Sequence, residues 1–159
     1  MKRLIILLMA PLVLFLTNSI VFADDGTEAL KFFKKYVNAA NSYDESVLRM
    51  YAPNAKIIRQ VIKPDGELVD VETDAPTYIN QLRIGQKVAR FRRYKNTYTN
   101  VTASKVDNGY KISAMRQPSG EKYRLRSYMI VKKQPNGEWK IIEELMQTKV
   151  QTFLKYANK

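Results

Sequence analysis

The residues whose types and spacing could do chemistry lie in the last two predicted strands, 122–133 and 139 onward. Side chains alternate between the two faces of a strand, so Glu143 shares a face with Arg124 and Arg126 when the two strands pair. A carboxylate beside a guanidinium in a cleft can orient a polar ligand. The same residues can equally form a cross-strand ion pair that contributes little to stability.

A two-residue turn at Asn136-Gly137 predicts the register of this hairpin. It places Lys132 opposite Ile141 and Ile130 opposite Glu143. One face then carries Arg124, Arg126, Tyr128, Ile130, Ile141, Glu143, Leu145 and Gln147. The other carries Tyr123, Leu125, Met129, Val131, Ile142, Met146 and Val150. We expect the first face to be concave, which predicts a pocket of Arg, Tyr and Glu. The reverse arrangement gives an apolar pocket and leaves these charges in solvent.

Tyrosine hydroxyls offer a second set of candidates. Tyr43, Tyr51, Tyr78 and Tyr128 could line a pocket and bind a ligand through their hydroxyls. The alternative is that these rings are half-buried packing residues of the sheet and helices, which is their more frequent role.

A basic run, rich in Lys and Arg, extends from Arg83 to Lys95. Phe91 and Tyr94 are interleaved with its cations, a pattern that suits phosphates or an anionic membrane surface. A solvated, positively charged helix end is the plainer interpretation. The candidate residues for an anionic partner are Arg83, Lys87, Arg90, Arg92, Arg93 and Lys95.

The composition excludes several kinds of chemistry. The chain has no cysteine and no histidine, which excludes Ser-His and Cys-His nucleophiles, disulfides and His or Cys metal sites. General acid-base catalysis would have to use Asp, Glu, Lys or Tyr side chains. No acidic loop with metal-ligand spacing is present, so we expect neither a metal nor a cofactor.

The N-terminus predicts export. Lys2 and Arg3 precede an apolar run from Leu4 to Leu16, and Val21-Phe22-Ala23 suits a cleavage site. We therefore expect residues 1–23 to be a signal peptide and residues 24–159 to form one domain, periplasmic or secreted. An uncleaved membrane anchor is the alternative. The formal net charge of +12 favours anionic partners, although export disfavours nucleic acid.

Periodicity predicts an α+β domain. We expect helices over residues 27–40, from Asp44 to about Ala52, and from Asp74 for an uncertain length, because Gly85 can end or interrupt the last of these. The predicted strands are 56–63, 67–72, 98–106, 110–117, 122–133 and from 139 past 150. The three helices should cover one face of a curved antiparallel sheet.

This element order resembles the nuclear transport factor 2-like superfamily, which includes ketosteroid isomerases and SnoaL-like cyclases. Residues 47–55 (VLRMYAPNA) resemble the family's second helix running into its first strand, and residues 136–141 (NGEWKI) resemble the start of its last strand. The resemblance implies a conical pocket between the helices and the concave sheet face, and often a dimer formed across the sheets. It does not imply one function.

The isomerase chemistry of that family does not carry over. The position of its Asp base falls on Arg59, which cannot accept a proton, and its second acid falls near Met129. Only the tyrosine of its oxyanion hole has a match, at Tyr36. Where SnoaL-like members often have a histidine after the tryptophan, this chain has Glu143. Tyr36 and Glu143 remain as weak catalytic candidates.

The function we expect from the sequence is that of an exported, non-catalytic domain that binds a small amphipathic or anionic ligand. An envelope interaction or assembly module is one alternative, and a lyase or isomerase of the cone-fold type is the other. A small molecule, an anionic lipid or a protein are the expected partners, with a homodimer through the convex sheet face. The candidate ligand-binding residues are Tyr51, Arg59, Tyr78, Arg124, Arg126, Tyr128 and Glu143.

Overall fold

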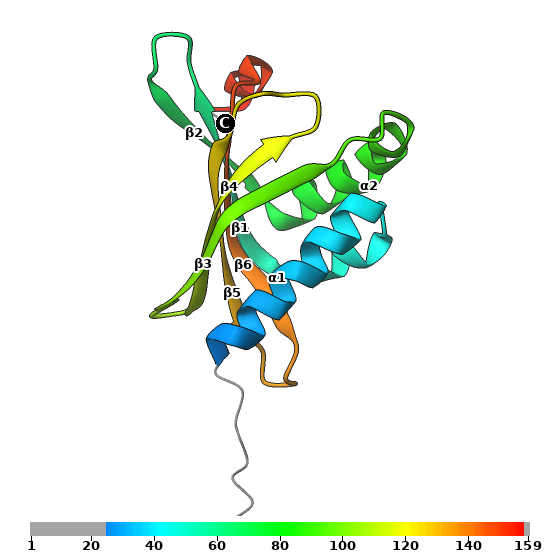
Figure 1. Ribbon diagram of the computed structural model, residues 1–159, viewed down its shortest axis with the longest axis vertical. Helices are drawn as coiled ribbons and strands as arrows, with labels where there is room; N and C mark the ends of the chain where they lie inside the picture. Colours follow the sequence, from blue (N-terminus) through cyan, green and yellow to red (C-terminus); the bar gives the residue numbers. More distant parts are fainter. Residues whose placement is uncertain (1–24, 158–159) are drawn as a thin grey trace, which may run out of the picture.

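One six-stranded sheet forms the centre of the molecule (Figure 1). The computed structural model describes residues 25–157, so the predicted signal segment 1–23 lies outside the described residues. The sheet order is β2-β1-β6-β5-β4-β3, in which only β1 and β6 are parallel. The strands are β1 (Tyr51–Ile62), β2 (Leu68–Asp74), β3 (Asn96–Val106), β4 (Gly109–Pro118), β5 (Leu125–Lys133) and β6 (Trp139–Thr148).

Two helices cover the same face of this curved, unclosed sheet (Figure 1). Helix α1 (Asp25–Ser42) packs mainly on β3 and β4, and α2 (Ala75–Phe91) packs on β1 and β2. Two short 3-10 helices, η1 (Glu45–Met50) and η2 (Gln151–Tyr156), complete the fold. The predicted α+β class, with helices in the N-terminal half, is confirmed.

The apolar spacing of α1 explains its packing. Ala29, Phe33, Tyr36 and Ala39 are buried, and their +4 and +3 spacing places them on one side of a helix. The rings of Phe33 and of Tyr98 in β3 meet edge to face, with their centroids 5.3 Å apart. These contacts hold α1 against the concave face.

Helix α2 continues past Gly85, the residue at which we expected that it could end. The Asp74 side chain accepts a hydrogen bond from the Thr77 amide at 2.8 Å and so caps the N-terminus, with Pro76 tolerated in the first turn. The helix passes through Gly85 and ends at Phe91. One interior glycine costs only about 1 kcal/mol relative to alanine, so packing of the surrounding turns outweighs it. Arg83, Lys87 and Arg90 of the basic run are therefore helical, whereas Arg92, Arg93 and Lys95 follow the end of the helix.

The strand ends differ most from the prediction in β1, β5 and β6. Strand β1 starts at Tyr51 instead of Lys56, because the parallel pairing with β6 already begins there. Its irregular register after Tyr51 accommodates Pro53, which has no amide hydrogen to donate. Strand β5 starts at Leu125, and β6 ends at Thr148 and is followed by η2.

A bulge in the last hairpin decides which side chains face the helices. Ile130 lies opposite Glu143 as predicted, but Val131 lies opposite Ile141 and Lys132 opposite Lys140. The extra residue on β6 turns Ile141 inward with Val131, and both are fully buried. The concave face is thus the more apolar one, and our expectation that Arg124, Arg126, Tyr128 and Glu143 lie on it is wrong.

No helix within residues 25–157 is long and apolar enough to cross a membrane. The same part of the chain holds no group of three or more acidic side chains able to bind a metal ion.

Candidate functional site

Glu144 of β6 is the centre of a buried polar cluster on the concave face. Its side chain is fully buried and accepts four hydrogen bonds. The Tyr51 hydroxyl donates to Oε2 at 2.7 Å, and Arg59 Nη1 donates to Oε1 at 3.0 Å. Longer bonds of 3.3 Å and 3.4 Å come from Tyr36 and Tyr78.

Four elements supply these side chains. Tyr36 comes from α1, Tyr78 from α2, Tyr51 and Arg59 from β1, and Glu144 from β6. The parallel pairing of β1 with β6 sets Ile57 opposite Glu144, so Arg59, two residues further on, lies on the same face beside it. The guanidinium of Arg59 also lies 4.7 Å from the centroid of the Tyr78 ring.

Burial keeps the hydroxyls of the cluster protonated. Loss of solvent, and then the charge of Glu144, raise the pKa values of Tyr36 and Tyr51 well above their usual range. Burial likewise raises the pKa of Tyr78 to about 12, against the opposing effect of Arg59. The three phenols therefore act as hydrogen-bond donors to a carboxylate, and none of them is poised as a base at neutral pH.

A cavity of about 980 Å³ lies beside this cluster, between α2, the end of α1 and the sheet. Tyr36, Arg59 and Tyr78 line it, whereas Glu144 does not reach it. Its apolar lining is Ala40, Val47, Val71, Leu82, Ala89, Met146, Val150 and Phe153. A cavity of this size and composition suits a small amphipathic molecule.

Arg116 of β4 lines the same cavity and has an unusual environment. It is only 6% exposed, yet it forms no ion pair with any side chain of residues 25–157. Nη1 donates to Asn96 Oδ1 at 2.9 Å and Nη2 to the Gln147 carbonyl at 2.8 Å. Nε is buried without a hydrogen-bond partner. A buried guanidinium is costly unless it is paired, and among the cations that line the cavity in the described chain Arg116 is the buried one without an ion pair.

Tyr43, at the start of the loop before η1, adds a second unpartnered group to the cavity. Its hydroxyl is buried without a hydrogen-bond partner, and the residue lines the cavity with Arg116. The Arg90 guanidinium lies 5.9 Å from its ring centroid and donates to its carbonyl at 3.3 Å. Two residues that line the cavity thus each hold a buried polar atom that nothing within the described residues satisfies.

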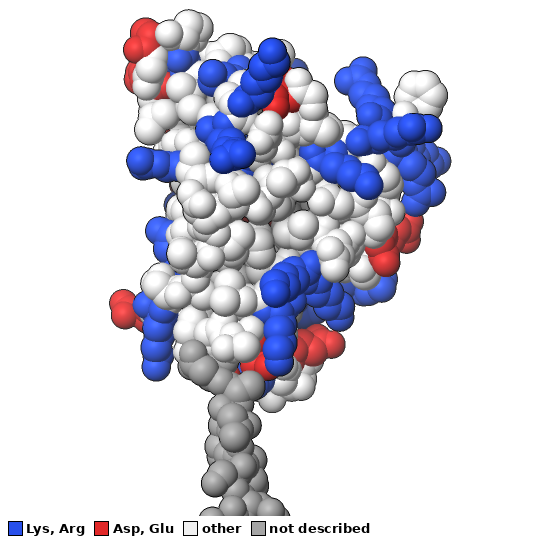
Figure 2. All heavy atoms as spheres, viewed as in Figure 1, with Lys and Arg blue, Asp and Glu red and all other residues white. Residues whose placement is uncertain are grey.

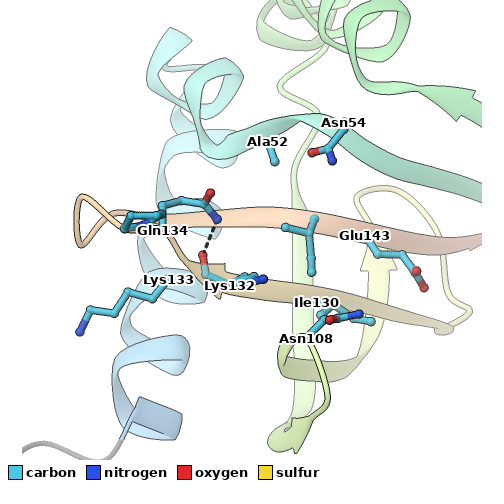
Figure 3. A pocket seen from close by; sticks show the side chains of 10 residues that line it. Ala52, Asn54, Asn108, Ile130, Lys132, Lys133, Gln134 and Glu143 are labelled. Carbon is cyan, nitrogen blue, oxygen red and sulfur yellow. Dashed lines mark hydrogen bonds between the residues drawn. The ribbon is translucent and has the colours of Figure 1, made fainter.

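A second hollow, of about 690 Å³, lies on the opposite face of the sheet. Lys132, Lys133 and Gln134 lie at its end near the β5–β6 turn, and Ile130 and Glu143 lie toward the other end (Figure 3). This hollow contains no cluster of buried charges comparable to that around Glu144, so we take the concave cavity as the candidate site.

The comparisons with known proteins identify the fold. The sequence matches no family model and no curated protein. Among solved structures, a nuclear transport factor 2-like protein from Cytophaga hutchinsonii superposes with a TM-score of 0.56 and 16% identity, over 79% of this chain and 99% of that one. One from Novosphingobium aromaticivorans, with a cystatin-like fold, gives 0.56 and 10%, over 77% and 80%.

The chain has the nuclear transport factor 2-like fold. A third neighbour, from Pseudomonas putida and of unknown function, gives a TM-score of 0.56 and 11% identity, over 77% of this chain and 84% of that one. The two sequence passages that resemble this family lie where the resemblance implies, at the junction of η1 and β1 and at the start of β6.

The nuclear transport factor 2-like cone brings together only some of the predicted site residues. Tyr51, Arg59 and Tyr78 meet at Glu144, and the weak catalytic candidate Tyr36 joins them. Arg59 also lines the cavity.

The remaining candidates lie on the convex face of the cone. Glu143 forms no ion pair with Arg124 or Arg126 and instead accepts a hydrogen bond from the Tyr128 hydroxyl at 2.6 Å. Arg124 donates to the side chain of Gln117 at 3.3 Å. Burial, and then the bond to Glu143, raise the pKa of Tyr128. None of these four residues lines the concave cavity.

Two residues of the cone, Glu144 and Arg116, were not among the candidates predicted from the sequence. Glu144 lies two positions from Met146 in β6, and Arg116 lies two and four positions from Ala114 and Ile112 in β4. Met146, Ala114 and Ile112 point to the concave side, so Glu144 and Arg116 do too. A charged residue in phase with an inward-facing strand pattern was the available signal. We did not use this signal, because we expected the face with Arg124, Arg126 and Glu143 to be the concave one.

The basic run lies on and just after α2. Figure 2 shows Lys and Arg gathered over the C-terminal end of this helix. The side chains of its six cations are all exposed. Exposure by itself does not test the prediction of an anionic partner.

Proposed function

We propose that this protein binds a small, anionic, amphipathic molecule in the cavity of its cone and does not transform it. The observation that carries the proposal is Arg116, a buried guanidinium on the cavity wall with no counter-ion within the described residues. A carboxylate on the ligand would supply that counter-charge, and the hydrocarbon part would lie against Leu82, Met146 and Phe153.

The polar cluster supports binding more than catalysis. Glu144 is the one buried carboxylate near the cavity within residues 25–157, but four donors saturate it and it does not line the cavity. Counted along the sequence from Tyr51, the position of the base in ketosteroid isomerases falls on Arg59, and an arginine cannot accept a proton. The alternative, a lyase or isomerase acting through Tyr36, requires a phenol whose raised pKa opposes its use as a base.

The test uses decanoate and decanol, which share a chain length and differ in charge. We expect decanoate to bind the wild-type protein more tightly than decanol, by isothermal calorimetry. Arg116→Met should weaken decanoate binding about 10- to 100-fold, since a charge-assisted hydrogen bond is worth roughly 1.5–3 kcal/mol, and should leave decanol binding unchanged.

Arg126→Met is the matched control, because it removes an exposed arginine of the convex face and changes the net charge equally. Its decanoate affinity should equal that of the wild type. Equal affinities for the acid and the alcohol, or equal losses in the two arginine variants, would contradict the proposal. Native mass spectrometry of protein purified from its producing cells would then identify a natural ligand by mass and give the oligomeric state, including any dimer through the convex face.

We also propose that the protein works outside the cytoplasm after removal of residues 1–23. The basic start, the apolar run 4–16 and the small residue Ala23 support this. The intact mass of the protein from its producing cells tests it. A mass that begins at Asp24 is expected, and a full-length mass would contradict cleavage.

A further inference from the structure

The outer side of α2 carries an apolar stripe that the fold does not use. Ile84, Val88 and Phe91 are 68%, 54% and 89% exposed. Their +4 and +3 spacing sets them in a line along one side of the helix. The opposite side of the same helix, with Leu82, Gln86 and Ala89, lines the cavity. Exposed apolar side chains in one continuous row mark an interaction surface more often than isolated ones do.

Cations flank this stripe on both sides and beyond its end. Lys87 and Arg92 lie on either side of it by helical phase, and Arg93 follows the C-terminus of the helix. All three side chains are exposed, and they form no ion pair with any residue from 25 to 157. The chain contains no Asp or Glu between Asp74 and Asp107. The stripe is therefore flanked by cations of its own segment, and Figure 2 shows Lys and Arg gathered at the end of α2.

We propose that the outer side of α2 docks this protein on an anionic phospholipid surface. Ile84, Val88 and Phe91 would enter the boundary between headgroups and acyl chains, while Lys87, Arg92 and Arg93 contact lipid phosphates. The arrangement matches an amphipathic helix that lies in the plane of a membrane interface. Ile84 and Val88 are aliphatic and cannot stack on bases, so the stripe suits lipid better than nucleic acid.

The proposal is independent of the cavity ligand, because it depends on the other side of the helix. The membrane contact would form without Arg116, and Arg116→Met should bind vesicles as the wild type does. This variant therefore separates failure of the docking proposal from failure of the proposed function.

The experiment is sedimentation of the full chain with vesicles of phosphatidylcholine alone or of phosphatidylcholine containing phosphatidylglycerol. We expect stronger binding to the anionic vesicles than to the neutral ones, and loss of this difference as salt is raised. The triple variant Lys87→Gln, Arg92→Gln, Arg93→Gln should bind about 100-fold more weakly, since each cation near such a surface contributes about fivefold. Wild type and variants share the apolar run 4–16, so differences between them report on α2.

The matched control removes three exposed lysines from other parts of the chain, as Lys34→Gln, Lys105→Gln, Lys122→Gln. It has the same net charge as the first triple variant and should bind nearly as the wild type does. Equal losses in the two triple variants would show attraction by net charge alone and would overturn the proposal.

Insertion of the apolar stripe is tested separately. Phe91→Trp should show a blue-shifted emission on anionic vesicles and quenching by brominated acyl chains, and Phe91→Ser with Ile84→Ser should reduce binding at least tenfold. An unchanged tryptophan emission on anionic vesicles would overturn the lipid assignment. So would the absence of vesicle binding together with capture of a protein partner that these same substitutions abolish.

Discussion

The hydroxyl of Tyr51 and the carboxylate of Glu144 lie 93 positions apart in the chain and are joined by a 2.7 Å hydrogen bond in the interior. Tyr51 opens β1 and Glu144 lies near the middle of β6, so the bond links the two parallel strands of the sheet. Tyr36 and Tyr78 bring α1 and α2 to the same carboxylate. One acidic side chain thus connects both helices to the sheet.

The first prediction concerns that carboxylate. Glu144→Gln should lower the free energy of unfolding by roughly 3–5 kcal/mol at neutral pH, because it leaves the guanidinium of Arg59 buried without a counter-charge. Urea denaturation measures the change. The double variant Arg59→Met, Glu144→Gln removes the stranded charge and should recover a large part of the loss.

Glu143→Gln is the control for this prediction. Its side chain accepts one hydrogen bond, from Tyr128 on the convex face, and it forms no ion pair within residues 25–157. We expect a loss of about 1 kcal/mol or less. Equal costs at the two neighbouring glutamates would mean that the buried pair contributes nothing specific to the fold.

The second prediction concerns alkaline pH. The pKa of Tyr78 is raised to about 12, and those of Tyr36 and Tyr51 are also raised, so the native state keeps protons that the unfolded chain loses above about pH 10. The stability these groups provide is complete below about pH 10 and is lost as the pH rises toward 12. Each contributes a slope of up to about −1.4 kcal/mol per pH unit in this window.

Chemical denaturation at several alkaline pH values measures that slope. Tyr78→Phe keeps the ring that faces Arg59 and removes only the titrating hydroxyl, so its stability should fall less steeply above about pH 10. An identical slope in the variant and the wild type would show that Tyr78 ionises equally in both states.

The third prediction concerns the β3–β4 turn. Gly109 has a φ of +144°, and a Cβ there would collide with the carbonyl oxygen of Val131 on the neighbouring strand. Because that oxygen belongs to the backbone of a fully buried residue, the clash cannot be relieved by a side-chain rotation. Gly109→Ala should cost about 3 kcal/mol or more, measured by thermal or urea unfolding.

Gly137→Ala provides the comparison, because this glycine also has a positive φ, of +85°, but open space around its Cβ position. Only the backbone strain remains, about 1–2 kcal/mol. A cost at Gly109 no greater than at Gly137 would show that the sheet can move away from the added methyl group.

The local elements were predictable from the sequence, because short-range physics decides them. The +3 and +4 spacing of Leu30, Phe33 and Val37 predicts the first helix, and Asp44 and Asp74 cap the helices that follow them. An Asn-Gly pair is typical of a two-residue hairpin turn, and the pairs at 108–109 and 136–137 both lie at hairpin turns. The absence of cysteine and histidine excludes whole classes of chemistry whatever the fold, because no arrangement of the chain can supply a thiolate or an imidazole.

Only the tertiary structure decided the site. The direction in which the sheet curves determines whether Glu143 or Glu144 is inside, and the bulge between Ile130 and Val131 changes the facing of Ile141. Alternation alone does not say which face the helices cover, although the face with Leu125, Met129 and Val131 is the more apolar of the two. The helices then select the face that buries Leu125, Met129 and Val131, because burying apolar area outweighs solvating it. That choice places Arg116 and Glu144 in the interior and leaves Arg124 and Arg126 in solvent.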